Sequence, residues 1–269
     1  MRRILAIAAL VSVGCSTPAE RFAERAMEQG LVRREIEGLG FQHAVFSRPT
    51  VAVSGELHVY LDGDGTPWLG PGQIAPDPSS RSPLVLALMA RDAAPSVLVG
   101  RPCYYRTIPD PACTAALWTS HRYSEAVVAS MTSVVARLLV EHPETRVTLI
   151  GYSGGGALAV LLAQRLRRTH AVITVGANLD TAAWTTLHRY TPLTGSLNPS
   201  EQPPLSGGIV QTHYFGAEDS DVPAASAARF FSRQKRVQPE VLAGFDHHCC
   251  WAERWPAILA RAKLVAHSE

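Results

Sequence analysis

No apolar run in this 269-residue sequence reaches the roughly 20 residues that a membrane-spanning helix needs. The first apolar run, residues 4–13 (ILAIAALVSV), is much shorter and follows the basic start Met1-Arg2-Arg3. A basic start and a short apolar core are typical of a targeting segment for export. We therefore expect residues 1–15 to be a signal peptide rather than a permanent membrane helix.

The sequence also lacks an excess of charge of either sign. It has 25 Lys and Arg residues against 23 Asp and Glu residues, a net charge of +2, and the basic residues are scattered. Binding to nucleic acid or to an anionic surface normally requires a basic patch, so the sequence supports neither kind of partner. No internal repeat is evident, and repeat architectures are therefore not indicated.

The segment after the first apolar run resembles the lipobox of bacterial lipoproteins. In that motif a cysteine after a small residue is lipidated and becomes the mature N-terminus, and Gly14-Cys15 fits this pattern. The residue three before the cysteine is usually leucine, whereas this sequence has Ser12. The resemblance implies an exported protein of the bacterial cell envelope, anchored to the membrane by a lipid on Cys15. The alternative is an ordinary secretory signal with an incidental cysteine.

Cysteine is scarce, with five residues in the whole sequence. If Cys15 carries lipid, four remain, and an even number in an exported chain indicates disulfides. Cys103 and Cys113 flank a proline-rich loop and are the natural pair, while the adjacent Cys249 and Cys250 can bond to each other or elsewhere. A zinc site built from these cysteines and neighbouring histidines is less consistent with the sequence, because the paired Cys-x-x-Cys spacing of structural zinc sites is missing.

The composition is that of one globular α/β domain. Hydrophobic residues make up 46% of the sequence, and a chain of about 250 residues can bury a full core in a single domain. We expect a helical segment over residues 16–40 and a single domain over residues 41–269. Alternation of strand and helix around residues 147–176 favours a mostly parallel sheet with helices on both faces. Strands are expected at residues 41–46, 50–53, 56–61, 96–100, 147–150, 171–176, 211–215 and 237–243, and helices at residues 18–30, 83–91, 124–141, 157–166 and 255–265.

The best-defined motif is residues 151–155 (GYSGG), which lie between a short apolar run and a longer one. Here a strand must turn into a helix within about four residues. Glycine at 151 and 155 would avoid a collision with the neighbouring strand or helix. The pattern is typical of a nucleophile elbow, in which Ser153 is exposed at a helix N-terminus and the Gly154 amide can hold a developing oxyanion. The alternative is a glycine-rich turn with a purely structural serine.

A strand, an elbow and a helix in this arrangement resemble the α/β-hydrolase superfamily. In that family the loop after the third strand supplies a second oxyanion amide. Here the expected strand at residues 56–61 runs into Asp62-Gly63-Asp64-Gly65, and the resemblance implies that Gly63 or Asp64 donates. The residues alone also allow a plain β-turn or a calcium loop, although the calcium loop lacks its Glu at the twelfth position.

The resemblance also implies a position for a catalytic acid. Residues 216–223 (GAEDSDVP) fit the family's Gly-x-x-Asp-x-x-Val-Pro pattern, which places the acid at Asp219. A carboxylate is needed because it orients an imidazole and stabilises the positive charge that forms on it. Asp221 and Asp180 are the alternatives, and Asp219 and Asp221 can also serve simply as helix caps.

The base is expected after the last strand, in residues 244–251 (GFDHHCCW). Family members commonly have a histidine soon after a glycine with an aromatic residue a few positions later, which fits His247 better than His248. The order Ser153, Asp219, His247 along the chain is that of α/β-hydrolases and differs from chymotrypsin and subtilisin. The resemblance covers residues 41–265, and within the superfamily the chain is similar to bacterial envelope lipoproteins of this fold.

The implied function is that of a serine hydrolase acting on a carboxylic ester or related acyl substrate through an acyl-enzyme intermediate. This chemistry requires no metal and no organic cofactor. The expected partners are a small-molecule ester or acyl substrate and, through the lipid anchor, the membrane. The alternatives are a non-catalytic envelope lipoprotein that uses the fold for binding, and an acyltransferase. Residues 101–119 form an irregular loop that can line a pocket beside the site or act as a disulfide-braced cap.

Overall fold

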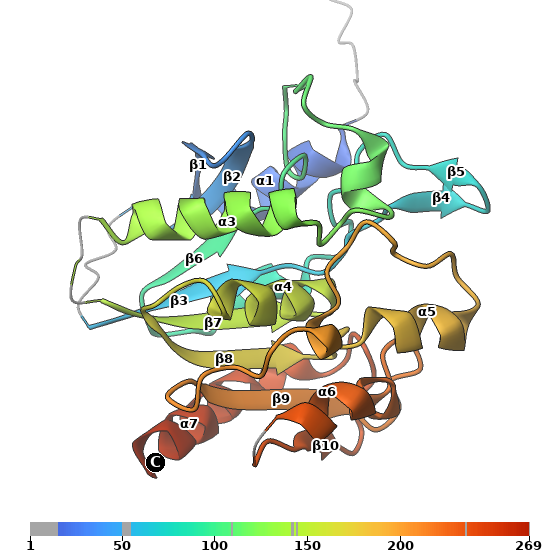
Figure 1. Ribbon diagram of the computed structural model, residues 1–269. Coiled ribbons are helices and arrows are strands. Elements are labelled where there is room, and N and C mark those ends of the chain that lie inside the picture. The colour runs from blue at the N-terminus through green and yellow to red at the C-terminus, as the bar shows by residue number, and fades with distance from the viewer. Residues whose placement is uncertain are drawn as a thin grey trace, which may run out of the picture.

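The computed structural model describes residues 16–49, 55–108, 110–140, 143, 145–234 and 236–268. The expected strand at residues 50–53 and the predicted signal peptide with its lipidation site Cys15 lie outside the described residues. Within them, an eight-stranded sheet runs through the molecule in the order β1-β2-β6-β3-β7-β8-β9-β10 (Figure 1). Its strands are β1 (Val32–Glu37), β2 (Gln42–Ser47), β3 (Glu56–Leu61), β6 (Ser96–Val99), β7 (Arg146–Tyr152), β8 (Thr169–Val175), β9 (Val210–Gly216) and β10 (Pro239–Leu242).

The sheet is mostly parallel, as predicted. Each pair of neighbours from β6 through to β10 is parallel, whereas β2 is antiparallel to both β1 and β6. Seven of these strands match expected strand ranges. Because the carboxyl ends of parallel strands meet at one edge of a sheet, the loops after β3, β7, β9 and β10 gather at the same edge, where ligands bind in folds of this kind.

Helices cover both faces of the sheet (Figure 1). Side chains of α3, α4 and α6 form one apolar cluster with the sheet, and side chains of α1, α2 and α7 form a second cluster on the opposite face. Successive side chains along a strand point to opposite faces of the sheet, so Leu149 packs in the first cluster and Ile150 in the second. The helices are α1 (Pro18–Glu28), α2 (Leu84–Met89), α3 (Glu125–Leu138), α4 (Gly154–Ala163), α5 (Thr181–His188), α6 (Ala228–Arg233) and α7 (Trp251–Ser268).

Helix α4 is apolar on all sides because it lies between the sheet and α3. All of its residues are buried, and its leucines and valine belong to the cluster that also contains Val127 and Met131 of α3. A helix with no polar face is stable only in such a fully enclosed position. No helix in the described residues combines the length and apolar composition needed to cross a bilayer.

The prediction of a helical segment over residues 16–40 was wrong in its second half. Helix α1 begins at a capping box between Thr17 and Glu20, but the chain then forms β1, which pairs with β2 so that Val32 lies opposite Ser47. The sequence of β1, VRREIE, is dominated by charge, and Ile36 packs against the core. Strands at the edge of a sheet carry such charges, which obscures the alternation that identifies a strand.

Two elements near the carboxyl edge of the sheet were not predicted. A short hairpin, β4 (Trp68–Gly70) and β5 (Gln73–Ile74), lies between the expected strand at residues 56–61 and the expected helix at residues 83–91. Helix α5 follows β8, with Asp180 as its N-cap. In Figure 1 the hairpin and α5 lie on the right, at the edge toward which the parallel strands point.

A buried polar network ties β3 to α7 and to the turn after α2. His58 Nδ1 lies 2.6 Å from Asp92 Oδ2, and the Tyr60 hydroxyl donates to the same oxygen at 2.6 Å. Trp255 Nε1 donates to the Tyr60 hydroxyl at 2.9 Å. Burial alone would lower the pKa of His58, but hydrogen bonds and charges from Asp92 and Glu56 outweigh burial and raise it to about 9.

This network predicts a specific pH dependence of stability. A histidine whose pKa is raised in the folded state contributes stability that is complete below its ordinary pKa of 6.5 and is lost as the pH rises through about 9. The difference in unfolding free energy between the wild type and His58→Gln should therefore shrink by up to roughly 3 kcal/mol between pH 6.5 and pH 9. Urea unfolding at several pH values measures this difference.

The matched control is His43, which is also fully buried and lies 2.8 Å from the Gly100 carbonyl oxygen and 2.7 Å from Ser130 Oγ. Burial lowers the pKa of His43 to about 4, so it stays neutral between pH 6.5 and pH 9. The cost of His43→Gln should be constant over that range. An equally constant cost for His58→Gln would show that His58 is neutral in the folded protein.

Candidate active site

Ser153 lies at the turn between β7 and α4, with φ 52° and ψ −122°. This backbone conformation costs a residue with a side chain on the order of 1–3 kcal/mol, so the surroundings must hold it. The Ser153 amide donates to the Val175 carbonyl at 2.9 Å, and the Ser153 carbonyl accepts from the amides of Gly156 at 2.9 Å and Asn178 at 3.3 Å. Strand β8 and the residues after it therefore fix the position of the serine.

The glycines around Ser153 allow three backbone segments to meet. A Cβ at Gly151 would overlap the Gly155 carbonyl oxygen, and a Cβ at Gly155 would overlap the Leu61 carbonyl oxygen at the end of β3. A Cβ at Gly156 would overlap the side chain of Ala177. The expectation that glycine is required at 151 and 155 is confirmed. The close contact also brings the loop after β3 beside the serine.

His247 lies between Ser153 and Asp219. Its Nε2 is 3.1 Å from Ser153 Oγ, and its Nδ1 is 2.8 Å from Asp219 Oδ2. The histidine comes from the loop between β10 and α7, and the aspartate from the loop after β9, so separate loops at one edge of the sheet bring the three side chains together. When Nδ1 donates to the carboxylate, Nε2 is left as an acceptor for the serine hydroxyl.

The carboxylate of Asp219 is held in place from its other side. Its Oδ1 accepts hydrogen bonds from the amides of Asp221 at 2.9 Å and Val222 at 2.8 Å. Burial would raise the pKa of Asp219, but the hydrogen bonds from His247 and these amides outweigh burial and keep the pKa below its ordinary value. Asp219 is therefore ionised at neutral pH and can stabilise a positive charge on the imidazole.

The structure places the alternative acid and base residues elsewhere. His248 Nδ1 lies 3.0 Å from the Tyr152 hydroxyl, and its side chain is 70% exposed. Asp221 is also exposed, with Oδ2 4.0 Å from His248 Nε2. Asp180 caps α5 and accepts a hydrogen bond from Asn198 Nδ2 at 2.9 Å.

The loop after β3 lies beside the serine, but one of the predicted oxyanion donors does not fit. A Cβ on Gly63 would lie 3.4 Å from Ser153 Cβ, yet the Gly63 amide already donates to Asp62 Oδ1 at 2.8 Å. In the described part of the chain, the backbone amides of Asp64 and Gly154 donate a hydrogen bond to no protein group. The Asp64 side chain packs against the Gly154 Cα. Asp64 and Gly154 therefore stay candidates, and Gly63 does not.

Ser153 and His247 line a cleft of about 1020 Å³. Its walls come from the loop after β3, the β4–β5 hairpin, the segment before α3, and α5 with the residues that follow it. Trp68, Trp184 and Tyr190 give the walls aromatic surface, and Trp184 packs edge-on against Tyr190 at 5.3 Å between ring centroids. A cleft of this size and lining can hold a small-molecule substrate.

Comparison with known proteins agrees with this geometry. The family model described as "Lipase (class 3)" matches residues 105–181. An esterase from Pyrococcus furiosus superposes with a TM-score of 0.58 at 12% identity, covering 93% of this chain and 95% of its own. A hydrolase from Agrobacterium vitis gives a TM-score of 0.59 at 12% identity, with coverage of 86% and 98%. A membrane phospholipase A, described as a bacterial virulence factor, gives 0.54 at 14% identity, with 91% of each chain covered.

The chain has the α/β-hydrolase fold. The strand order, the elbow and these similarities agree on this point, and the chain is similar to esterases and a phospholipase of this fold. A search of curated protein sequences gives no match. Similarity at 12–14% identity shows that the proteins share a fold, and it does not show that they share a substrate.

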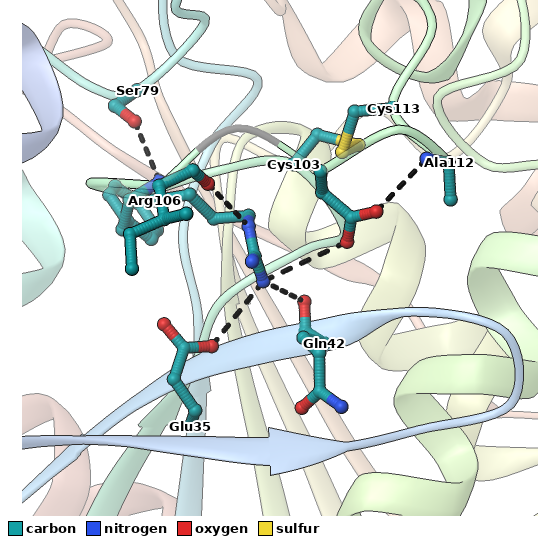
Figure 2. Close-up of a disulfide and its surroundings, with 10 residues drawn as sticks. Glu35, Gln42, Ser79, Cys103, Arg106, Ala112 and Cys113 are labelled. Carbon is teal, nitrogen blue, oxygen red and sulfur yellow. Dashed lines mark hydrogen bonds and ion pairs between the residues drawn. A yellow bond between two sulfur atoms is a disulfide. The ribbon is translucent and has the colours of Figure 1, made fainter.

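The irregular segment over residues 101–119 contacts β1 and contributes little to the cleft. Cys103 is joined to Cys113, the pair that the sequence favoured, with their Cα atoms 5.6 Å apart. Next to the disulfide, Arg106 Nη1 reaches Glu35 Oε2 of β1 at 3.4 Å (Figure 2). Among the described residues of this segment, only Thr119 lines the cleft.

The loop that carries His247 is closed by local contacts. Cys249 is joined to its neighbour Cys250. Asp246 Oδ1 accepts from the Cys249 amide at 2.6 Å, and the Asp246 carbonyl accepts from Trp251 Nε1 at 2.9 Å. These contacts fix the loop at the start of α7.

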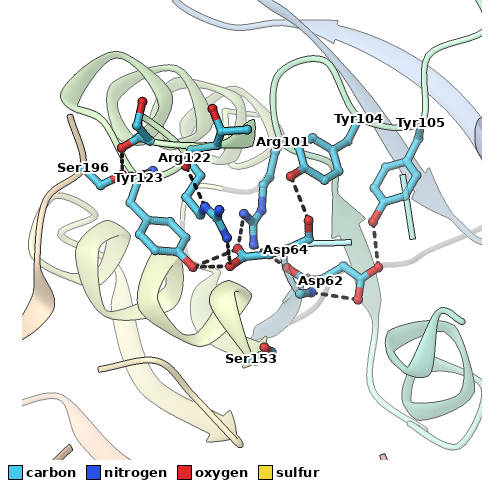
Figure 3. A network of polar contacts seen from close by, with 12 residues as sticks. Asp62, Asp64, Arg101, Tyr104, Tyr105, Arg122, Tyr123, Ser153 and Ser196 are labelled. Atoms are coloured by element: carbon cyan, nitrogen blue, oxygen red, sulfur yellow. Dashed lines mark hydrogen bonds and ion pairs between the residues drawn. The ribbon is translucent and has the colours of Figure 1, made fainter. Parts of the chain in front are cut away.

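The sequence analysis missed a group of buried polar residues behind the loop after β3. Arg101, Arg122 and Tyr123 all contact the Asp64 carboxylate (Figure 3). The only local signal is that Arg101 follows the expected strand at residues 96–100 and that Arg122-Tyr123 directly precedes the helix cap Ser124. Nothing in the sequence pairs these residues with Asp64.

The close packing around Gly155 predicts that Gly155→Ala destabilises the protein, whereas helix propensity alone predicts that it stabilises the protein. Replacing glycine by alanine in a helix normally stabilises it by about 1 kcal/mol. At Gly155 the new Cβ would overlap the rigid backbone of β3, and overpacking typically costs 1–3 kcal/mol or more. Gly155→Ala should therefore lower the unfolding free energy in urea.

The control is Gly207→Ala, because a Cβ at Gly207 has no atom within 4 Å and its φ is compatible with alanine. This variant should be as stable as the wild type within about 0.5 kcal/mol. If Gly155→Ala were as stable as Gly207→Ala, α4 would not pack against β3 as closely as described.

Proposed function

We propose that this protein is a serine hydrolase that cleaves a carboxylic ester or related acyl substrate. The observation that carries the proposal is the continuous chain of contacts from Ser153 through His247 to Asp219, at 3.1 Å and 2.8 Å. A serine hydroxyl is a weak nucleophile unless a base removes its proton. This arrangement supplies the base and holds it in the required orientation.

In the proposed mechanism His247 Nε2 takes the proton of the Ser153 hydroxyl while the oxygen attacks the substrate carbonyl carbon. Asp219 stabilises the imidazolium that forms. The amides of Asp64 and Gly154 receive the negative charge on the carbonyl oxygen. His247 then protonates the departing alcohol, leaving an acyl group on Ser153, and activates the water that releases it. No step requires a metal or an organic cofactor.

The cleft supports a substrate with an apolar acyl group. Trp68 and Tyr190 are 45% and 55% exposed and line the cleft from the β4–β5 hairpin and from the residues after α5. Such surfaces can cover an acyl chain or ring while Ser153 meets the carbonyl. The similar structures include proteins described as an esterase and as a membrane phospholipase A, and both names denote enzymes that hydrolyse acyl esters.

We also propose that the protein works in the bacterial cell envelope. The support is the sequence of the first 15 residues, with its short apolar run and Cys15, together with the Cys103–Cys113 disulfide. Disulfides persist in oxidising compartments outside the cytosol. An acyl ester of the envelope is therefore the substrate class that we propose to test first.

Covalent labelling tests the proposed nucleophile. The protein without residues 1–15 should react with a fluorophosphonate, and Ser153→Ala should abolish the label while the protein stays folded, because only an activated serine reacts. His247→Ala should slow labelling by about 10²- to 10⁴-fold, the usual contribution of a general base. Intact mass spectrometry over time gives each rate.

His248→Ala is the matched control, since the neighbouring histidine contacts the Tyr152 hydroxyl instead. Its labelling rate should stay within about threefold of the wild type. A folded wild-type protein that does not label would contradict the hydrolase proposal and favour a binding function for the same cleft. A slow His248→Ala with a fast His247→Ala would instead reverse the assignment of the base.

A further inference from the structure

The loop Asp62-Gly63-Asp64 is held by side chains that reach it from a distant segment (Figure 3). That segment comprises residues 101–123, between β6 and α3. It contributes Arg101 and Arg122 to the contacts with the loop, and these two arginines are only 4% and 6% exposed. Charged side chains are buried this deeply only when they are paired.

The Asp64 carboxylate is the centre of these contacts. Arg101 Nη1 donates to Oδ1 at 2.6 Å, and Arg122 Nη1 donates to Oδ2 at 2.8 Å. The Tyr123 hydroxyl lies 2.8 Å from Oδ1 and 2.7 Å from Oδ2. These contacts outweigh burial and keep the pKa of Asp64 well below its ordinary value, so the group is a fixed anion.

The backbone of the loop is held as firmly as the carboxylate. The Tyr104 hydroxyl donates to the Asp64 carbonyl at 2.9 Å, and Arg101 Nη2 donates to the Asp62 carbonyl at 3.0 Å. The Tyr105 hydroxyl donates to the Asp62 carboxylate at 2.7 Å. The carbonyls and carboxylates of both aspartates are therefore occupied by protein donors.

None of these contacts uses the Asp64 amide. The side chain of the same residue packs against the Gly154 Cα, next to the nucleophile. An oxyanion donor is effective only when it is held in place before the reaction, since reorientation would cost part of the stabilisation. A loop with glycine on both sides of Asp64 is flexible by itself and needs such a support.

We propose that Arg101, Arg122 and Tyr123 are positioning residues, which fix the Asp64 side chain and so aim the Asp64 amide as the second oxyanion donor. This inference rests on the proposed hydrolase function. It also explains why two guanidinium groups are buried here. A buried ion cluster that served stability alone could be replaced by apolar residues at little cost.

A pair of tyrosine variants separates positioning from stability. Tyr123→Phe removes one donor to the Asp64 carboxylate. Tyr60→Phe removes one donor, at 2.6 Å, to the Asp92 carboxylate in the network of β3 and α7. Both tyrosines are fully buried, so both variants should lose a comparable part of their thermal stability, about 2–8 °C in Tm. Only Tyr123→Phe should lower the rate at which Ser153 reacts.

The readout is the saturation kinetics of fluorophosphonate labelling, which separates the maximal labelling rate from the concentration for half-saturation. Tyr123→Phe should lower the maximal rate about threefold to tenfold and leave half-saturation unchanged. This is less than the 10²- to 10³-fold expected when an oxyanion donor is lost entirely. With p-nitrophenyl butyrate as ester, kcat should fall and KM should not. Tyr60→Phe should match the wild type in all four constants.

Asp64→Asn extends the test, because it keeps the shape of the side chain but removes the charge that both arginines contact. Its maximal labelling rate should fall about tenfold to a hundredfold. If it does not fold, the tyrosine pair still decides. Equal losses of Tm with unchanged rates in both tyrosine variants would overturn the positioning role while leaving the hydrolase proposal intact. A folded wild type that neither labels nor cleaves the ester would overturn both.

Discussion

The contact between the N-terminal turn of α4 and the end of β3 is the constraint on which the site depends. Gly155 lies directly against the Leu61 carbonyl, and any side chain at this position would push the two segments apart. This approach sets the loop after β3 beside Ser153, whose positive φ is held by hydrogen bonds to Val175 and Asn178. One backbone contact thus joins the nucleophile to the loop that would hold the oxyanion, and the remaining groups are arranged around that junction.

Much of the fold could be predicted from local pattern. The buried parallel strands are short apolar runs, and the elbow combines strand, glycines and apolar helix within residues 147–163. Edge strand β1 was missed because its charged sequence has no apolar alternation. The β4–β5 hairpin was missed because its few residues sit among proline and glycine.

The candidate site could be predicted in part. The motif residues Ser153, Asp219 and His247 are brought together by the structure, and their catalytic role is our proposal. The choice between two adjacent histidines depends on which imidazole faces the serine, and spacing along the chain cannot show this. Gly63 was named as a donor because the sequence does not reveal that its amide turns back to Asp62. Contacts between Asp64 and residues 37 and 58 positions away depend on the finished fold.

The central claim is that Ser153 reacts while the amides of Asp64 and Gly154 hold the charge that develops on the substrate oxygen. A crystal structure of the protein after reaction with a fluorophosphonate tests this most directly, because the phosphonyl oxygen marks the oxyanion position. The account predicts phosphorus bonded to Ser153 Oγ and that oxygen within about 3 Å of both amide nitrogens. An adduct on another residue, or a phosphonyl oxygen that faces solvent or a different donor, would contradict it.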